Sequence, residues 1–316
     1  MAGPIYVELA IAAPRERLWE LTQTPALHER WDLRFTSITY LPRPDEAQPQ
    51  RFRYTTQLGF GLCIAGWGET VGEQRGDDVW TSALKFGSDD TKSLIREGSG
   101  YWQYRTTPDG QQQFLTQYDY RVRWGLLGRT ADLVFRPLMG WATAWSFDRL
   151  RLWAERGVDP TLSAVRALVE ALCRVALGLV WLYQGIVPKL LLGHPRELEL
   201  MTAAGFAPAQ AHTWLQVAGW CEVAAGLAVL LLGPRRSVFV ASAVVAVAVT
   251  LPALRTSPGI FVEPFNPTTL VLAMLALSAC GFVVCKDLPS ARRCLQRKKE
   301  EKRAVNLRAG NGPGIR

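Results

Sequence analysis

The sequence predicts an α+β domain followed by an all-α membrane domain. Up to about residue 124, apolar and polar side chains alternate, which is typical of an antiparallel sheet wet on one face. From about residue 129 the apolar residues recur at helical spacing, and beyond residue 160 come four long apolar runs. We expect a curved antiparallel sheet around a long C-terminal helix at 1–157, a four-helix transmembrane bundle at 162–287 and a basic cytoplasmic tail at 288–316.

The charge balance points to a membrane surface. The 316 residues include 36 Lys and Arg against 28 Asp and Glu, a formal net charge of +8. The excess lies in the second half, beside the apolar runs. In the first half the basic residues form no stripe interleaved with aromatics, so we expect no nucleic-acid partner. The six cysteines show no metal-ligand spacing, so we expect no metal site.

The strands of the first half are marked by alternation. Two proline-led segments, at Pro14 and Pro25, each predict a short helix between the first strand and the rest. The buried faces of the strands are rich in aromatic residues. The alternating runs are Ile5–Ile11, Arg51–Leu58, Val79–Phe86 and Gln111–Trp124.

The order of elements and the segment PRERLWELTQTPALHERWDLRFTSITY resemble the START-like, or polyketide-cyclase-like (SRPBCC), helix-grip superfamily over residues 3–155. The resemblance implies a hydrophobic cavity between the sheet and the long helix, which in many members binds a lipid-like ligand. Trp31 and Arg34 would guard its entrance. The alternative is that the aromatic side chains only fill a core. The residues that would line the cavity are Tyr54, Trp80, Tyr118, Tyr120, Trp141 and Trp145.

The first half shows no arranged catalytic set. It contains no Ser/His/Asp or Cys/His combination, and its one histidine, His28, is expected at the surface or in the first turn of a helix. The sequence therefore leaves open whether the protein is an enzyme, and it names no catalytic residue.

The four apolar segments predict a topology. The amino-terminal residues lack a basic region followed by an apolar stretch, so the first half is expected to remain in the cytoplasm. Arg235 and Arg236 between the second and third segments, and the basic residues after the fourth, follow the positive-inside rule. We expect both termini on the cytoplasmic side of a bacterial-type inner membrane. The segments are Leu168–Pro188, Thr213–Leu232, Val238–Leu254 and Thr268–Cys285.

Glu222 lies at the middle of the second segment, where a charge costs about 2.5–3.5 kcal/mol on insertion scales. Gly219 and Gly226 share its helix face and would admit a neighbouring helix closely. In the first segment we expect Arg174 to pair with Glu170 and also to reach Glu222. This pairing would either fix the helix register or handle a ligand or protons.

A second polar group is expected at the outer ends of the segments. Gln184 and Lys189 close the first segment, and Glu263 precedes Asn266, which is placed to cap the fourth helix. The connection around them either dips into the outer leaflet to meet a small polar or quinone-like head, or is an ordinary loop.

WLYQGIVPKLL, PRELELMTAAG, AGWCEVAAGLAVLL and EPFNPTTL together resemble the DoxX-like membrane family over residues 165–286. The resemblance implies a four-helix inner-membrane module, whose relatives are associated with quinone-linked or thiol-linked oxidoreductase systems. The positions to which it directs attention are Gln184, Lys189, Glu222, Glu263 and Asn266.

These observations lead to one main hypothesis and two alternatives. The main one is an integral membrane protein whose cytoplasmic domain binds a hydrophobic, lipid or polyketide-like molecule and is coupled to a DoxX-like module. The first alternative is an accessory or catalytic subunit of a quinone-linked membrane oxidoreductase, with quinone as the cofactor and that oxidoreductase as partner. The second is a structural scaffold. In each case membrane lipids are partners.

Overall fold

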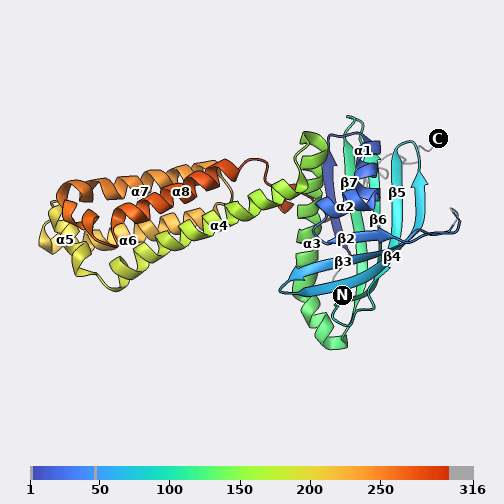
Figure 1. Cartoon of the computed structure of the whole chain (residues 1–316), viewed down its shortest axis with the longest axis horizontal. Coiled ribbons are helices and arrows are strands. Elements are labelled where there is room, and N and C mark those ends of the chain that lie inside the picture. The colour runs from blue at the N-terminus through green and yellow to red at the C-terminus, as the bar shows by residue number, and fades with distance from the viewer. Residues whose placement is uncertain (1–2, 46–47, 299–316) are drawn as a thin grey trace, which may run out of the picture. The chain divides into compact units, whose positions relative to one another are not determined.

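The computed structural model describes residues 3–45 and 48–298, and the chain divides into two compact units (Figure 1). The first comprises Met1–Pro160 and Pro289–Arg316, and the second comprises Thr161–Leu288. Each has a hydrophobic core of its own. The second unit is therefore inserted, along the chain, between two parts of the first.

The first unit contains a seven-stranded antiparallel sheet with the strand order β1-β7-β6-β5-β4-β3-β2. The expected alternating runs are all strands, and β1 has the expected bounds. The strands are β1 (Ile5–Ile11), β2 (Ser37–Tyr40), β3 (Arg51–Gly59), β4 (Leu62–Arg75), β5 (Val79–Gly87), β6 (Ile95–Thr106) and β7 (Gln112–Val122).

Aromatic rings on the inner face of the sheet lie over glycines of the neighbouring strand. Gly66 is paired with Tyr54, and Gly100 with Tyr118. A Cβ added at Gly66 would lie 2.2 Å from the Tyr54 ring, and one at Gly100 would lie 2.4 Å from Tyr118 Cβ. Only glycine fits at these positions. Glycines at such places let a sheet curve, so the rings converge on the concave side.

One long helix, α3 (Gly125–Arg156), lies across the inner face of this sheet (Figure 1). Two short helices, α1 (Arg15–Gln23) and α2 (Pro25–Trp31), connect β1 to β2. Phe147 of α3 stacks on Phe114 of β7 with ring centroids 4.5 Å apart. The expected curved sheet around one long helix is confirmed, because the core forms between α3 and the concave face.

The segment after the second unit returns to the first. The backbone groups of Leu295 and Glu8 form two hydrogen bonds of 2.9 Å, so the segment extends the free edge of β1. The fully buried carboxylate of Asp148 accepts hydrogen bonds from the amide of Ser290 at 2.7 Å and from Arg293 at 2.6 Å. Residues expected to begin a separate tail at 288 instead pack on the sheet and α3, because an open strand edge offers unpaired backbone groups. The predicted tail beyond residue 298 lies outside the described residues.

The second unit is helical. Among the described residues, α6, α7 and α8 are long and apolar enough to cross a membrane. The fourth expected span lies in α4, which is not among them and carries Arg166, Glu170 and Arg174. The elements are α4 (Pro160–Gln184), the π-helix η1 (Gly185–Leu191), α5 (Pro195–Ala203), α6 (Pro208–Leu231), α7 (Arg236–Thr256), the 3₁₀ helix η2 (Pro258–Val262) and α8 (Pro267–Val284).

Glycines spaced seven residues apart bring α4, η1 and α6 into close contact. A Cβ at Gly185 would lie 2.6 Å from the carbonyl oxygen of Gly219. A Cβ at Gly226 would lie 3.0 Å from the carbonyl oxygen of Gly178. The glycine face of α6 thus packs against the first segment, as expected for helices that meet through small residues. Glu222 lies on this face and is buried.

Candidate functional sites

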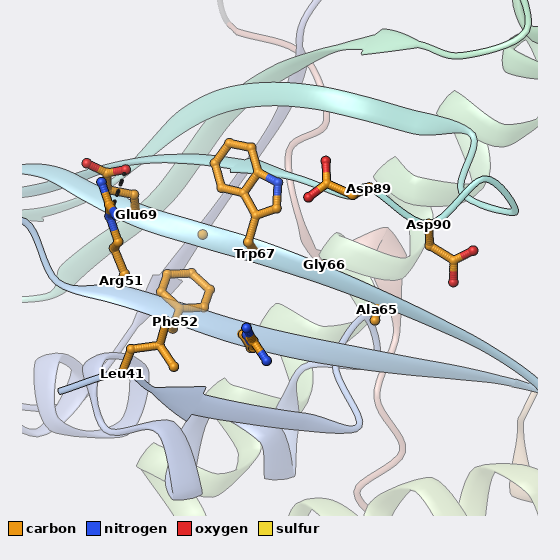
Figure 2. Close-up of a pocket in the computed structure, with 11 residues that line it drawn as sticks. Leu41, Arg51, Phe52, Ala65, Gly66, Trp67, Glu69, Asp89 and Asp90 are labelled. Carbon is orange, nitrogen blue, oxygen red and sulfur yellow. Dashed lines mark ion pairs between the residues drawn. The ribbon is translucent and has the colours of Figure 1, made fainter.

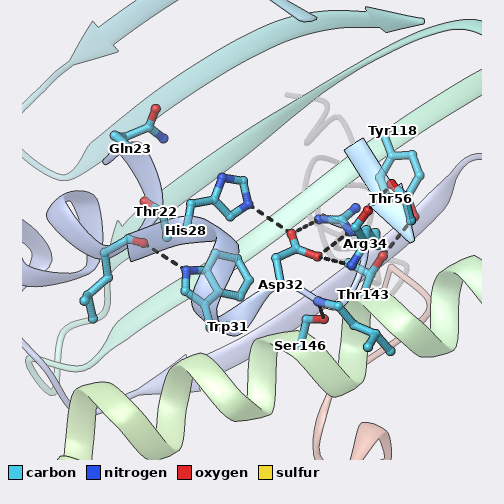
Figure 3. A network of polar contacts seen from close by, with 12 residues as sticks. Thr22, Gln23, His28, Trp31, Asp32, Arg34, Thr56, Tyr118, Thr143 and Ser146 are labelled. Carbon is cyan, nitrogen blue, oxygen red and sulfur yellow. Dashed lines mark hydrogen bonds and ion pairs between the residues drawn. The ribbon is translucent and has the colours of Figure 1, made fainter. Parts of the chain in front are cut away.

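The first candidate site is a polar network around Asp32, at the end of α2 (Figure 3). Arg34 grips the carboxylate with two nitrogens, Nε at 2.9 Å from Oδ1 and Nη2 at 2.6 Å from Oδ2. His28 Nε2 lies 3.0 Å from Oδ2. The Asp32 side chain is fully buried, so this two-point ion pair satisfies a carboxylate that has no access to water.

The electrostatics of the network keep Asp32 charged. Burial alone raises the pKa of Asp32, but the charge and hydrogen bonds of Arg34 and the hydrogen bond with His28 outweigh it and hold the pKa below its usual range. Burial lowers the pKa of His28, against the opposing effect of Asp32. At neutral pH the network therefore contains a carboxylate, a guanidinium and a neutral imidazole, with no net charge.

The position of His28 corrects a prediction. Its side chain is 12% exposed rather than at the surface, and its ring stacks on Trp31 with centroids 4.9 Å apart. The reason is that α2 turns this face toward Trp102 of β6, whose ring lies edge-on at 4.9 Å. A seven-residue helix shows too little periodicity for the sequence to reveal its inner face.

Two of the residues predicted to bind a ligand, Arg34 and Tyr118, meet between the sheet and α3, and Tyr120 lies two residues further along β7. The Arg34 guanidinium lies 5.5 Å from the centre of the Tyr118 ring. The Tyr118 hydroxyl is 2.9 Å from Thr143 Oγ1, and the Tyr120 hydroxyl donates to Asp132 at 2.7 Å. These contacts place polar groups from β7 and α3 beside Arg34, on the concave side of the sheet.

The other predicted residues lie in different surroundings. Trp31, expected at a cavity entrance, has no exposed surface and donates from its indole nitrogen to the carbonyl of Leu21 at 2.9 Å. Trp80 contacts Trp19, and the Tyr54 hydroxyl donates to the carbonyl of Gly87. Trp145 stacks on Trp141, which is 45% exposed. The ligand contacts of these residues stay predictions.

A groove of about 490 Å³ lies on the outer face of the sheet, around Trp67 of β4 (Figure 2). None of the eight predicted ligand-binding residues lines it. At its edge Arg51 and Glu69 form an ion pair of 3.5 Å. Alternation along 51–58 places Arg51 and Arg53 on the polar face of the strand and Phe52 on the inward face, so no sequence signal indicates a hollow there. The lining residues are Leu41, Arg51, Phe52, Arg53, Ala65, Gly66, Trp67, Gly68, Glu69, Asp89 and Asp90.

The second candidate site is a buried charge cluster in the helical unit. Lys189 Nζ lies 3.0 Å from Glu222 Oε2 of α6 and 3.5 Å from Glu197 Oε1 of α5. Both Lys189 and Glu222 are 8% exposed. Lys189 belongs to η1, where Pro188 lacks the N–H needed to continue an α-helix. A π-helical turn inside a helix is often found at a functional site.

The expected Arg174–Glu222 pair is wrong, although the expected Arg174–Glu170 pair is confirmed at 3.0 Å. Arg174 also donates to the carbonyl of Leu230 at 2.9 Å, so it is level with the end of α6. Leu230 is eight residues beyond Glu222, about 12 Å at 1.5 Å per residue. The Arg174 side chain is too short to reach Glu222 over that distance. The closer cation, Lys189, takes the place of Arg174.

The remaining polar residues lie at the connections. Asn266 caps α8, since its side-chain oxygen accepts from the amide of Thr269 at 3.2 Å, as expected. Glu263 is paired with Arg196 of α5. Gln184 joins the cluster only through its backbone carbonyl, 3.4 Å from Lys189 Nζ. Lys189 and Glu222 are thus brought together, whereas the side chains of Glu263 and Asn266 bind elsewhere.

Sequence comparison places the helical unit in a known family. Residues 178–279 match the DoxX-like family. The uncharacterized membrane protein YndG of Bacillus subtilis (strain 168) is 50% identical over 184 residues, which are 58% of this chain and 68% of YndG. The chain belongs to the family of YndG. It is a membrane protein with a DoxX-like unit.

Solved structures similar to the chain include the aromatase/cyclase Zhui from Streptomyces sp. R1128, with 12% identity and a TM-score of 0.37. The match covers 49% of this chain and 98% of Zhui. The hypothetical protein jhp0584 from Helicobacter pylori has 14% identity and a TM-score of 0.35, covering 48% of this chain and 86% of jhp0584. These comparisons concern fold alone. The sheet order and long helix of the first unit are those expected of an SRPBCC domain.

Replacing Asp32 with Asn should lower the free energy of unfolding by about 3–5 kcal/mol, because the buried Arg34 charge loses its counterion. The matched control is Glu20→Gln, which breaks the exposed pair with Arg17 and should cost less than about 1 kcal/mol. Denaturant unfolding of the full-length protein in detergent, followed by tryptophan fluorescence, measures both. Equal losses in the two variants would contradict the role of the network.

A double-mutant cycle tests the buried cluster. Lys189→Met and Glu222→Gln should each destabilise the protein, while the double variant should cost less than the sum, with a coupling of about 1–3 kcal/mol. The Arg174→Met and Glu222→Gln pair is the control and should be additive within about 0.5 kcal/mol, since those side chains do not meet. Stronger coupling in the control cycle than in the Lys189–Glu222 cycle would mean that Arg174, rather than Lys189, pairs with Glu222.

Proposed function

We propose that this protein crosses the membrane four times and presents, on the cytoplasmic side, a helix-grip unit that binds a hydrophobic molecule. The observation that carries the topology is the return of residues 289–296 to the first unit. The helical unit therefore begins and ends at the same soluble unit. A chain that leaves and re-enters one side of a bilayer crosses it an even number of times.

The number of crossings follows from this return of the chain to the first unit. Three residues, 157–159, separate α3 from α4, and the segment after α8 binds Asp148 and Glu8 of the first unit. Helices α6, α7 and α8 supply three crossings. The fourth then falls to α4, continued by η1. The Glu170–Arg174 ion pair reduces the cost of placing these charges near the membrane surface.

The orientation rests on the connections. Arg235 precedes α7 and Arg236 begins it, on the same side as the first unit if each helix crosses once. The outer connections contain paired charges, such as Arg196 with Glu263. By the positive-inside rule the soluble unit then lies in the cytoplasm.

The chemistry of the ligand is suggested by the network on the concave side. Asp32 already balances the charge of Arg34 and engages its Nε and Nη2, and the Tyr118 hydroxyl is a further hydrogen-bond partner of the guanidinium. A network with no net charge favours a neutral oxygen acceptor over a free acid. Aromatic rings surround it. These features support an apolar ligand with a carbonyl or hydroxyl group, which includes neutral lipids and polyketide-like molecules.

The alternative, a subunit of a quinone-linked oxidoreductase, is supported by the Lys189–Glu222 pair. A quinone that accepts two electrons also takes up two protons, and a buried ammonium beside two carboxylates can deliver protons and be reloaded. Electrons would come from a membrane oxidoreductase partner. Glu197, with a side chain 24% exposed, would connect Lys189 to water. Under this alternative the helical unit, rather than the helix-grip unit, would carry the function.

The topology predicts a labelling pattern for single cysteines introduced into a variant lacking native reactive cysteines. A membrane-impermeant maleimide added to intact cells should label Ala204→Cys, in the connection after α5. It should label Glu16→Cys of α1 and Pro234→Cys, between α6 and α7, only after the membrane is permeabilised. Labelling of both Ala204→Cys and Pro234→Cys in intact cells would mean that α6 does not cross.

Ligand binding predicts that the protein, purified in mild detergent, carries an apolar molecule detectable by native mass spectrometry. Arg34→Lys keeps the charge opposite Asp32 but loses the planar fork, and should reduce occupancy about tenfold, the effect of losing roughly 1.4 kcal/mol. Arg17→Lys, in an exposed ion pair, is the matched control and should retain the molecule. Equal occupancy in both variants, at equal thermal stability, would contradict the proposed site.

A further inference from the structure

The first half of α3 exposes large apolar side chains in a cluster. Leu126, Leu127, Leu133 and Val134 are 71–80% exposed, far beyond what a helix packed on a sheet usually leaves to water. Leu138, at 54%, continues the cluster. Single exposed leucines are ordinary on a protein surface, but a contiguous group marks an interaction site.

The exposed residues form one continuous arc of the helix. At about 100° per residue, the side chains from Leu133 through Leu126 to Leu138 span an arc about 140° wide. The charged residues Arg129, Asp132 and Arg136 all lie outside it. From Leu126 to Trp141 the arc runs about 22 Å along the helix axis. The opposite side, including Gly128, Phe135 and Met139, packs toward the core of the first unit.

We propose that this face of α3, which we call the apolar arc (residues 126, 127, 133, 134, 138 and 141), lies on a lipid bilayer with its side chains in the headgroup and upper acyl region. Tryptophans stand at both ends of the arc, since Trp124 and Trp141 are each 45% exposed. Amphipathic aromatic rings of this kind concentrate at membrane interfaces. Arg129 is exposed at the edge of the arc, where its guanidinium can reach a lipid phosphate.

A bilayer fits this surface better than a second copy of the chain does. A partner helix covers a narrow seam, whereas an arc of about 140° would leave many side chains uncovered unless the opposing surface were broad. The soluble unit is also joined at both ends to the helical unit of a membrane protein. Such a connection gives lipid a high effective concentration at the arc, independent of protein concentration.

Binding of this face to lipid does not depend on the proposed ligand. The arc lies on the side of α3 away from Phe135 and Met139, which pack in the core, and Trp141 is its one member among the predicted ligand-binding residues. Loss of ligand from Arg34→Lys and loss of lipid contact from a change in the arc are therefore separate outcomes.

The experiment uses the full-length protein reconstituted into phosphatidylcholine–phosphatidylglycerol vesicles, with Cys63, Cys221 and Cys280 replaced. A polarity-sensitive fluorophore is attached at Leu133→Cys, and vesicles with and without a spin-labelled lipid are compared. Lipid contact should blue-shift the emission and cause strong quenching by the spin label. The matched control is Lys85→Cys, exposed on the outer face of β5, which should show little quenching.

Two results would overturn the proposal. One is quenching at position 133 no stronger than at position 85. The other is a blue shift that disappears when the protein is diluted in excess lipid, as a contact between two copies would require. A second variant, Leu133→Cys carrying Val134→Asp and Leu138→Asp, changes only exposed positions and should fold normally while losing most of the quenching. Undiminished quenching there would also count against lipid contact by the arc.

Discussion

The architecture depends on the closure of the chain at the free edge of β1. The backbone bridge between Leu295 and Glu8 pairs strand-edge groups that would otherwise need water, and Asp148 fixes the same segment to α3. Because this closure follows the last helix, the helical unit is an insertion into the soluble unit rather than an appendage. Both ends of the insertion are held by one folded body, and a bilayer-spanning insertion with that property needs an even number of crossings.

In each unit a buried charged group is neutralised by an ion pair. In the soluble unit a carboxylate is gripped by two nitrogens of one guanidinium, and in the helical unit an ammonium lies between two carboxylates. A buried charge is tolerated only when paired, so each cluster fixes the elements that supply its members. The Asp32 network ties α2 to the residues that lead into β2. The Lys189 cluster ties η1 to α5 and α6.

The first unit has two apolar surfaces, one on the concave side of the sheet and one on the exposed side of α3. Inside, the glycines of β4 and β6 admit the rings of β3 and β7, which curve the sheet toward α3 and give the concave side its aromatic character. Outside, the first half of α3 carries an apolar arc that no described side chain of the sheet covers. The proposed binding of an apolar molecule concerns the aromatic concave side, and the proposed lipid contact concerns the exposed arc of α3.

Local patterns in the sequence determined much of this protein. Alternation located β1, β3, β5 and β7, and apolar runs located the helices of the membrane unit. Gly219 and Gly226 identified the face of α6 that meets another helix. These features are encoded by neighbours in the chain, whose periodicity is fixed by backbone geometry.

Only the tertiary structure decided which distant groups meet. The close packing of the glycines of α4 and α6 sets the offset between the two helices. Arg174 therefore lies about 12 Å along the helix axis from Glu222, and Lys189 pairs with Glu222 instead. The burial of His28 and the docking of residues 289–296 depend in the same way on surfaces formed by remote parts of the chain. The sequence shows which side chains of a segment are suited to burial, but the tertiary packing determines which distant residues contact them.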